Sequence, residues 1–401
     1  MFGHRIASHG AHTGQACREQ GLLQGQDTHS LLDLGRTRRM MDIFQTAPDS
    51  AVADRDATVR LSAPARLHLG FLDPAGSLGR RFGSLGLVVN GFETEIELSA
   101  STCEQVSSSA DTDPAEVDRA AGYLRVLQRH TGRHEPLRLR LLKMLPAHAG
   151  FGSGTQLALA IGRAFAHWHG LNVSTPTLAR WLGRGSRSGI GIAGFDEGGL
   201  LVDGGPGADG QPGMMLARIA VPADWRVLVV QDTAQQGLWG ADENHAIATL
   251  PPLPASLSAD ICHQVLMRVL PGAAGAEFAP FAAGVTRIQK ILGEHFAPAQ
   301  GGASFTSPAV GRLVEWIGEA MPASDPAAAT RNASEAAKAA IGQSSWGPTG
   351  FAILPSQSRA EAVVEAARAA NLIAASLTLR IVSARNTGAT LIDRRPPQRN
   401  H

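Results

Sequence analysis

The chain has 401 residues, of which 44% are hydrophobic and 18% are charged, and its formal net charge is +1. These values are typical of a globular protein long enough for two domains. The small net charge argues against a nucleic-acid or membrane-surface partner, and no apolar run reaches the ~20 residues of a membrane helix. Three cysteines without a C-x-x-C pair argue against disulfides and zinc fingers, and favour a reducing, cytoplasmic location.

Composition divides the chain into four predicted parts. Residues 1–55 are polar, rich in His and Gln and without periodicity, which predicts a flexible extension or a misassigned start with Met40 or Met41 as alternatives. We expect an N-terminal domain over 56–210, a C-terminal domain over 211–395 and a tail over 396–401. The Gly/Pro-rich segment 204–213 is either the domain boundary or a long hairpin.

Strand and helix patterns mix along the chain without strict β-α-β alternation, which predicts an α+β fold with mixed or antiparallel sheets packed against helices. Apolar alternation and short apolar runs predict strands over 58–72, 83–98, 137–141, 199–203, 225–230, 351–354 and 377–382. Apolar residues at helical spacing predict helices over 114–130, 157–168, from 175 onward, and over 256–270, 276–292, 307–317, 334–340 and 358–372.

The most informative segment, 145–156, joins a predicted strand to a predicted helix. Its glycines allow a close approach of the backbone to an anion, and the first N–H groups of a helix lack partners at the positive end of the helix dipole. We therefore predict a phosphate-binding loop, with an ordinary glycine turn as the alternative. The segment is neither a P-loop nor a G-x-G-x-x-G dinucleotide turn. Its candidate ligand-binding residues are Gly150, Gly152, Ser153, Gly154, Thr155 and Gln156.

Three more segments combine glycines with arginine or hydroxyl side chains: 79–84, 183–191 and 344–350. An arginine fork suits phosphate and carboxylate because two N–H groups meet two oxygens. A surface turn is the alternative for each segment alone, but several such segments together favour a shared anion site. The candidates are Arg80, Arg81, Arg184, Arg187, Ser188, Ser344, Ser345, Gly347 and Thr349.

Two other groups of residues are candidates for chemistry. Asp196 and Asp203 follow the second arginine-rich segment and could hold Mg²⁺, with turn or surface carboxylates as the alternative. Arg66 and His68 lie two residues apart on a predicted strand and so share a face. His68 and His148 are candidate acid/base groups because an ordinary histidine pKa lies near neutrality, although a structural histidine is the alternative for each.

The residues around these motifs resemble those of the GHMP kinase superfamily. Segment 63–70 (APARLHLG) resembles its first motif, 146–155 its phosphate-binding motif and 344–350 its third motif. Within that superfamily the chain is most similar to the β-ribofuranosylaminobenzene 5′-phosphate synthases, over about residues 58–393. The phrases that carry this similarity are RLHLGFLD (66–73), GRRFGSLG (79–86), GSGTQLAL (152–159), GRGSRSGIG (183–191), VDGG (202–205), SSWGPT (344–349) and NTGA (386–389).

This resemblance implies a pentosyltransferase. The family joins phosphoribosyl pyrophosphate to 4-aminobenzoate or 4-hydroxybenzoate through a C–C bond at ribose C1, with loss of CO₂ and pyrophosphate, for tetrahydromethanopterin biosynthesis. We accordingly expect Mg²⁺, no organic cofactor, no nucleic-acid or membrane partner, and a homodimer. The alternatives are an ATP-dependent GHMP small-molecule kinase and a ligand-binding protein that kept the fold. Gly154 and Thr155 stand where the kinases have Ser and Ala, and no lysine lies beside the loop, which argues against ATP.

Roles follow from the implied reaction. The 150–156 loop would bind phosphate or pyrophosphate, and Arg184 and Arg187 would bind the second anionic end. One of Arg66, Arg80 and Arg81 would hold the benzoate carboxylate. Arg66, His68 and His148 are the catalytic candidates. The aromatic residues available to wall a water-excluding pocket are Phe71, Phe82, Phe151 and Trp346.

Overall fold

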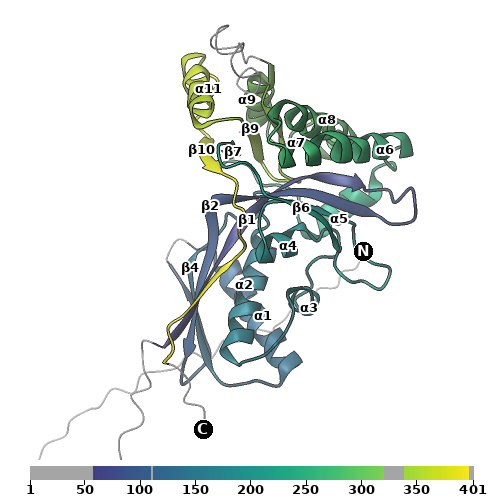
Figure 1. The fold of residues 1–401 in the computed structure, drawn as a ribbon. Helices are drawn as coiled ribbons and strands as arrows, with labels where there is room; N and C mark the ends of the chain where they lie inside the picture. Colours follow the sequence, from purple (N-terminus) through teal and green to yellow (C-terminus); the bar gives the residue numbers. More distant parts are fainter. Residues whose placement is uncertain (1–56, 110–111, 320–337, 397–401) are drawn as a thin grey trace, which may run out of the picture. The chain divides into compact units, whose positions relative to one another are not determined.

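The structure is a computed structural model that describes residues 57–109, 112–319 and 338–396 (Figure 1). These residues belong to one compact unit, Val52–His401. The predicted N-terminal extension, the tail from residue 397 and most of the predicted helix 334–340 lie outside the described residues. None of the described helices combines the length and the apolarity needed to cross a bilayer.

The first sheet is built on a long antiparallel pair, β1 (Thr58–Asp73) and β2 (Phe82–Ala100). Its strand order is β11-β1-β2-β4-β3, and β5 pairs with the other half of β2 and carries β6. The shorter strands are β3 (Gln105–Ser108), β4 (Leu137–Lys143), β5 (Leu200–Asp203), β6 (Met215–Ile219) and β11 (Thr390–Asp393). Segment 204–213 joins the antiparallel strands β5 and β6, so it forms a long hairpin connection. The predicted domain boundary near residue 210 stays a prediction.

Helices α1 to α4 gather on one side of this sheet in Figure 1. They are α1 (Pro114–Thr131), α2 (Ser153–Trp168), α3 (Thr175–Trp181) and α4 (Ile190–Asp196). The face of α2 that carries Leu157, Ile161 and Phe165 is buried against apolar residues of β1 and β2, including Leu61 and Ile96. This burial holds the N-terminus of α2 in place, directly after the glycine loop.

The second sheet has the order β10-β7-β9-β8 and is antiparallel throughout. Its strands are β7 (Arg226–Asp232), β8 (Ala340–Gln343), β9 (Thr349–Leu354) and β10 (Leu377–Ser383). The helices of this region are α5 (Gly240–Thr249), α6 (Ala255–Gln264), a π-helical turn (Val265–Val269), α7 (Leu270–Ala274), α8 (Phe278–Phe296), α9 (Pro308–Glu319) and α11 (Gln357–Ala369). One apolar core joins the two sheets, because Leu67 and Leu69 of β1 pack with Val229 of β7 and Phe281 and Ile288 of α8.

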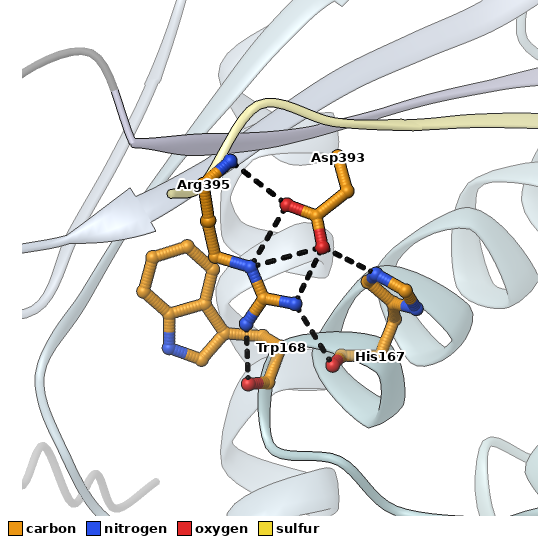
Figure 2. Close-up of polar contacts among 4 residues, drawn as sticks. All are labelled: His167, Trp168, Asp393 and Arg395. Carbon is orange, nitrogen blue, oxygen red and sulfur yellow. Dashed lines mark hydrogen bonds and ion pairs between the residues drawn. The ribbon is translucent and has the colours of Figure 1, made fainter. Parts of the chain in front are cut away.

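The C-terminal strand β11 is tied to the C-terminal end of α2 (Figure 2). Arg395 donates from Nη2 to Asp393 at 2.7 Å and from Nη1 to the carbonyl of Trp168 at 2.8 Å. Its guanidinium lies 5.1 Å from the centre of the Trp168 ring, and His167 Nε2 lies 2.8 Å from the Asp393 carboxylate. A cation at the carbonyl end of a helix complements the helix dipole, so this cluster braces α2 at the end opposite the glycine loop.

The predicted α+β class and most of the predicted elements are confirmed. One element is wrong in part: Ala340 was assigned to a helix but begins strand β8, where it pairs with Ile353. The alanine-rich sequence before it favours a helix, but pairing with β9 overrides that propensity. The patterns also missed short elements, among them α4, α5, β6 and β11.

Candidate active site

Three motifs that are far apart in the sequence are joined by hydrogen bonds. Ser344 Oγ donates to the carbonyl of Gly150 at 2.8 Å and accepts the backbone N–H of His68 at 2.9 Å. Arg66 donates from Nη1 to the same carbonyl at 2.7 Å, and its backbone N–H donates to Phe151 at 3.2 Å. Strand β1, the glycine loop and the segment before β9 therefore meet at one place.

The glycines of the loop are required by these close approaches. Gly150 has φ +91°, and a Cβ there would lie 2.4 Å from the carbonyl oxygen of Ser344. Gly152 has φ +77°, and a Cβ there would lie 3.0 Å from the guanidinium carbon of Arg66. Both conformations are left-handed and favour glycine. The loop can therefore pass against Arg66 and Ser344 only because it carries no side chains at these positions.

Helix α2 begins with an open N-terminus. Its N-cap is Gly152, which supplies no capping side chain, and Ser153, Gly154 and Thr155 are partly exposed. The N–H groups of Thr155 and Gln156 already donate to the carbonyl of Gly152, so the free donors of the first turn precede them. Unpaired N–H groups at the positive end of a helix dipole form an anion-binding site.

Two arginines flank this helix start. If Gly154 carried a Cβ, Arg184 Nη1 would lie 3.5 Å from it and Arg119 Nη1 3.8 Å from it. Arg184 also donates to the hydroxyl of Tyr123 and lies over the Tyr123 ring at 5.4 Å. Arg184 is one of the anion-binding residues predicted from the glycine-rich segment 183–191, whereas Arg119 is not among the predicted residues. Nothing in the sequence distinguishes Arg119 from an ordinary surface residue of α1.

A second charged group surrounds Arg66. Arg187 donates from Nη2 to Glu243 at 2.7 Å, and its Nη1 is buried without a partner. Burial lowers the pKa of Arg66 to about 10 and the charge of Glu243 opposes that shift, so Arg66 stays protonated at neutral pH. Glu243, which the sequence analysis did not identify, lies in α5 and is partly buried. Its charge therefore acts on both arginines, as the hydrogen-bond partner of Arg187 and as the charge that opposes the pKa shift of Arg66.

His68 is 4% exposed and lies beside this charged group. Its Nδ1 accepts the N–H of Gly70 at 3.3 Å, whereas its Nε2 is buried without a partner. Burial, and then the charges of Arg66 and Arg187, hold the pKa of His68 well below the ordinary value. The ring is therefore neutral at physiological pH, with its single proton on Nε2.

His148 lies within the loop at φ +55° and stacks on Trp239, with ring centres 4.2 Å apart. The N–H of Gly237 donates to the carbonyl of His148 at 3.3 Å. Burial, and then the charge of Arg119, lowers the pKa of His148. Trp239 is 51% exposed, and the sequence analysis did not identify it. The segment before α5 thus lies against the glycine loop.

The two aspartates proposed as Mg²⁺ ligands are engaged elsewhere. Asp203 is 1% exposed, and its oxygens accept the N–H groups of Gly189 at 2.9 Å and Gly205 at 2.7 Å. Burial raises its pKa. Asp196 accepts the hydroxyl of Thr175 at 2.7 Å. No group of three His, Cys, Asp or Glu side chains that could hold a metal occurs in the part of the chain that the structure describes. Both oxygens of Asp203 are occupied, so it braces the arginine-rich loop. The roles of Asp196 and Asp203 as Mg²⁺ ligands stay predictions.

Other predicted residues divide between support and exposure. Ser344, Gly347 and Thr349 are buried, whereas Ser345 is partly exposed. Gln156 is fully buried and donates to the carbonyl of Gly191 at 2.9 Å. Arg80 and Arg81 are exposed, and Arg81 donates to the carbonyl of Pro74 in its own turn at 3.3 Å. Ser188 donates to Asp203 at 3.2 Å.

Comparisons with known proteins define the class of this fold. Residues 118–198 match the N-terminal domain of the GHMP kinases, and residues 303–372 match their C-terminal domain. The solved structure of a homoserine kinase from Cytophaga hutchinsonii superposes with a TM-score of 0.59 at 16% identity, covering 84% of this chain and 98% of that one. The fold is that of the GHMP kinases.

Two archaeal relatives share more of the sequence, and both are named β-ribofuranosylphenol 5′-phosphate synthase. The one from Archaeoglobus fulgidus is 35% identical over 246 residues, which cover 58% of this chain and 76% of the relative. The one from Methanothermobacter thermautotrophicus is 31% identical over 245 residues, which cover 57% of this chain and 74% of the relative. The chain belongs to the β-ribofuranosylphenol 5′-phosphate synthase family, which confirms the predicted family of pentosyltransferases.

Proposed function

We propose that this chain condenses phosphoribosyl pyrophosphate with a 4-substituted benzoate to form a C-riboside 5′-phosphate, with loss of CO₂ and pyrophosphate. The activity named for its relatives supports this proposal. The observation that carries it is the meeting of the glycine loop, Arg66 and Ser344 beside the open N-terminus of α2. The product would enter tetrahydromethanopterin biosynthesis.

The anionic sugar would bind across the start of α2. The diphosphate would accept from the first-turn N–H groups of the helix, between Arg119 and Arg184. As the bond from ribose C1 to the diphosphate oxygen breaks, its electron pair moves to the leaving group. Fixed N–H dipoles and arginines placed there stabilise that charge more in the transition state than in the ground state.

The benzoate would supply the attacking carbon, which is the ring carbon that bears the carboxylate. This carbon forms the new bond to ribose C1, and the carboxylate then leaves as CO₂ while its bonding electrons restore the aromatic ring. Arg66 is protonated at neutral pH and lies two residues from His68 on β1, so we propose that it holds the carboxylate until it leaves. Exclusion of water protects the sugar cation from hydrolysis.

Several finer expectations remain proposals. We propose that the reaction requires Mg²⁺, which would enter with the oxygens of the substrate diphosphate. Asp203 already accepts backbone N–H groups with both oxygens, and Asp196 accepts the hydroxyl of Thr175 with one of its two, so Asp196 is the better candidate for a protein ligand. We assign no organic cofactor. We also propose a cytoplasmic homodimer.

The test is incubation of the full chain with phosphoribosyl pyrophosphate, Mg²⁺ and carboxyl-labelled 4-hydroxybenzoate or 4-aminobenzoate. We expect labelled CO₂ and pyrophosphate in equal amounts, both dependent on the sugar. A parallel incubation with ATP, without the labelled benzoate, measures ADP. ADP formation without CO₂ release would identify a kinase, and binding of phosphoribosyl pyrophosphate without either product would identify a ligand-binding protein. Either result overturns the proposal.

A further inference from the structure

A pocket lies beside His68, between β1, α8 and the segment before β9. None of its lining residues is Asp, Glu, Lys or Arg, although Arg66 lies only two residues from His68 on the same strand. An uncharged pocket next to arginines can hold the neutral part of a molecule whose charged end stays outside. This arrangement suits a ligand with a flat apolar body and one anionic end.

Aromatic rings form part of the pocket wall. The rings of His68 and Phe71 meet edge to face with centres 4.6 Å apart, and the rings of Phe296 and Trp346 lie at the same separation with a tilt of 55°. Such pairs leave ring faces and edges that complement another aromatic ring. Of the four aromatic residues predicted to wall a pocket, Phe71 and Trp346 line this one together with Phe296 of α8, whereas Phe82 and Phe151 are not among its lining residues.

The amide side chains of the pocket are already occupied. Gln289 donates to the carbonyl of Leu69 at 2.7 Å and accepts from the N–H of Gln343 at 2.8 Å. Gln343 in turn donates to Gln300 and to the carbonyl of Ser345, each at 2.8 Å. Among the lining residues, all of which the structure describes, His68 Nε2 is the buried side-chain atom without a hydrogen-bond partner. A buried polar atom of this kind is costly unless a water molecule or a ligand pairs with it.

The polarity of that atom restricts its partner. Because Nδ1 of His68 accepts from Gly70, Nε2 carries the proton and acts as a donor. A phenol oxygen has a lone pair in the ring plane and accepts such a bond. The nitrogen of an aryl amine is a poor acceptor, because its lone pair is delocalised into the ring. The site therefore favours a hydroxyl over an amino substituent.

We propose that this pocket binds the benzoate ring with its para substituent on His68 Nε2–H and its carboxylate toward Arg66, so that His68 selects 4-hydroxybenzoate over 4-aminobenzoate. The assignment rests on the proposed function. It makes His68 a specificity-determining residue for one end of the substrate. It also separates the aryl subsite from the diphosphate subsite at the start of α2.

The first test fills the pocket. Ser304 lines it and is partly exposed, so Ser304→Phe places a ring in the space. Ser358→Phe, at an exposed serine of α11 that is not among the lining residues, is the matched control. For Ser304→Phe we expect KM for 4-hydroxybenzoate to rise at least about tenfold, with KM for phosphoribosyl pyrophosphate within about twofold of wild type. Ser358→Phe should leave both constants within about twofold. An unchanged benzoate KM in Ser304→Phe overturns the proposal.

The second test changes the donor. His68→Phe keeps a ring without a donor, and His68→Gln keeps an N–H at a similar reach. We expect His68→Phe to lower kcat/KM for 4-hydroxybenzoate by about 10- to 100-fold and to lower the preference over 4-aminobenzoate, and His68→Gln to restore part of that preference. Circular dichroism spectra and thermal unfolding curves verify that each variant folds. A preference that is unchanged in folded His68→Phe overturns the role of His68.

Failure of the proposed function remains distinguishable from failure of this inference. If the wild type releases no CO₂ from either benzoate, the reaction is wrong, and calorimetric titration of 4-hydroxybenzoate then tests the pocket by itself. Binding to wild type and to Ser358→Phe, with at least about tenfold weaker binding to Ser304→Phe, supports the aryl subsite. No binding to wild type, or equal binding to all three proteins, overturns it.

Discussion

Ser344 and Gly150 are 194 residues apart in the sequence, and the hydroxyl of Ser344 donates to the carbonyl of Gly150 at 2.8 Å. The same oxygen accepts the backbone N–H of His68. One small buried side chain thus connects the first strand, the glycine loop and the segment that precedes β9. Because the loop carries the proposed diphosphate site and His68 lines the aryl pocket, this hydroxyl also sets the relative placement of the two subsites.

Ser344→Ala should therefore weaken both the fold and the site. The substitution leaves the buried N–H of His68 without its acceptor, and we expect a loss of about 1–3 kcal/mol in the free energy of unfolding. Urea unfolding measures this loss. Ser358→Ala, at an exposed serine of α11, is the control and should change stability by less than about 0.5 kcal/mol. Equal stabilities of the two variants would contradict the bracing role of Ser344.

Gly152→Ala should lower stability by more than the strain of its left-handed backbone conformation alone. Gly132 has a similar left-handed conformation, with φ +68° against +77° for Gly152, but a Cβ at Gly132 would meet nothing within 4 Å. Gly132→Ala therefore isolates the backbone penalty of about 1–2 kcal/mol. Gly152→Ala adds the contact with Arg66, so we expect a larger loss of stability and a weaker affinity for phosphoribosyl pyrophosphate. Thermal melts and calorimetric titration measure the two effects, and the same affinity loss in both variants would reject the proposed loop geometry.

Arg187→Ala should lower the affinity for phosphoribosyl pyrophosphate by about 10- to 100-fold, because a charged hydrogen bond to phosphate contributes about 1.5–3 kcal/mol. It also leaves the partly buried Glu243 without its partner, which adds local repulsion of an anion. Arg368→Ala removes an arginine from an exposed ion pair with Glu365 and is the control. If Arg187→Ala binds phosphoribosyl pyrophosphate as tightly as the Arg368→Ala control does, Arg187 does not contribute to binding.

The cluster in Figure 2 predicts an acid-dependent contribution to stability. Hydrogen bonds from Arg395 lower the pKa of Asp393 below its ordinary value, so the ionised carboxylate stabilises the folded state. This contribution is complete above the unfolded-state pKa of about 4 and is lost as pH falls toward the lower folded-state pKa. Asp393→Asn should lower the free energy of unfolding by about 0.5–1 kcal/mol at pH 7.

The difference between wild type and Asp393→Asn should shrink between pH 5 and pH 3, as measured by urea unfolding across that range. Asp224→Asn, at an exposed aspartate, is the control and should leave the pH profile of the wild type in place. A constant difference across this range would show that Asp393 does not contribute through its charge.

The local patterns in the sequence predicted the glycine loop between a strand and a helix, because chain order alone places it at the N-terminus of α2. They also predicted that Arg66 and His68 share a face, since strand side chains alternate. The division of roles among polar residues could not be predicted in this way. Asp203 is a carboxylate next to an arginine-rich segment, which predicts a metal ligand, yet in the fold its oxygens accept backbone N–H groups.

The sequence by itself determined the family, the α+β class and the segments that carry the chemistry, because motifs and periodicities are local properties of the chain. Only the tertiary structure decided that Arg119 flanks the helix start, that Ser344 is a buried brace, and that His68 lines a pocket and has a buried Nε2 without a hydrogen-bond partner. The physical reason is that burial and the partners of a polar atom depend on which distant elements pack together, and local spacing does not encode that packing.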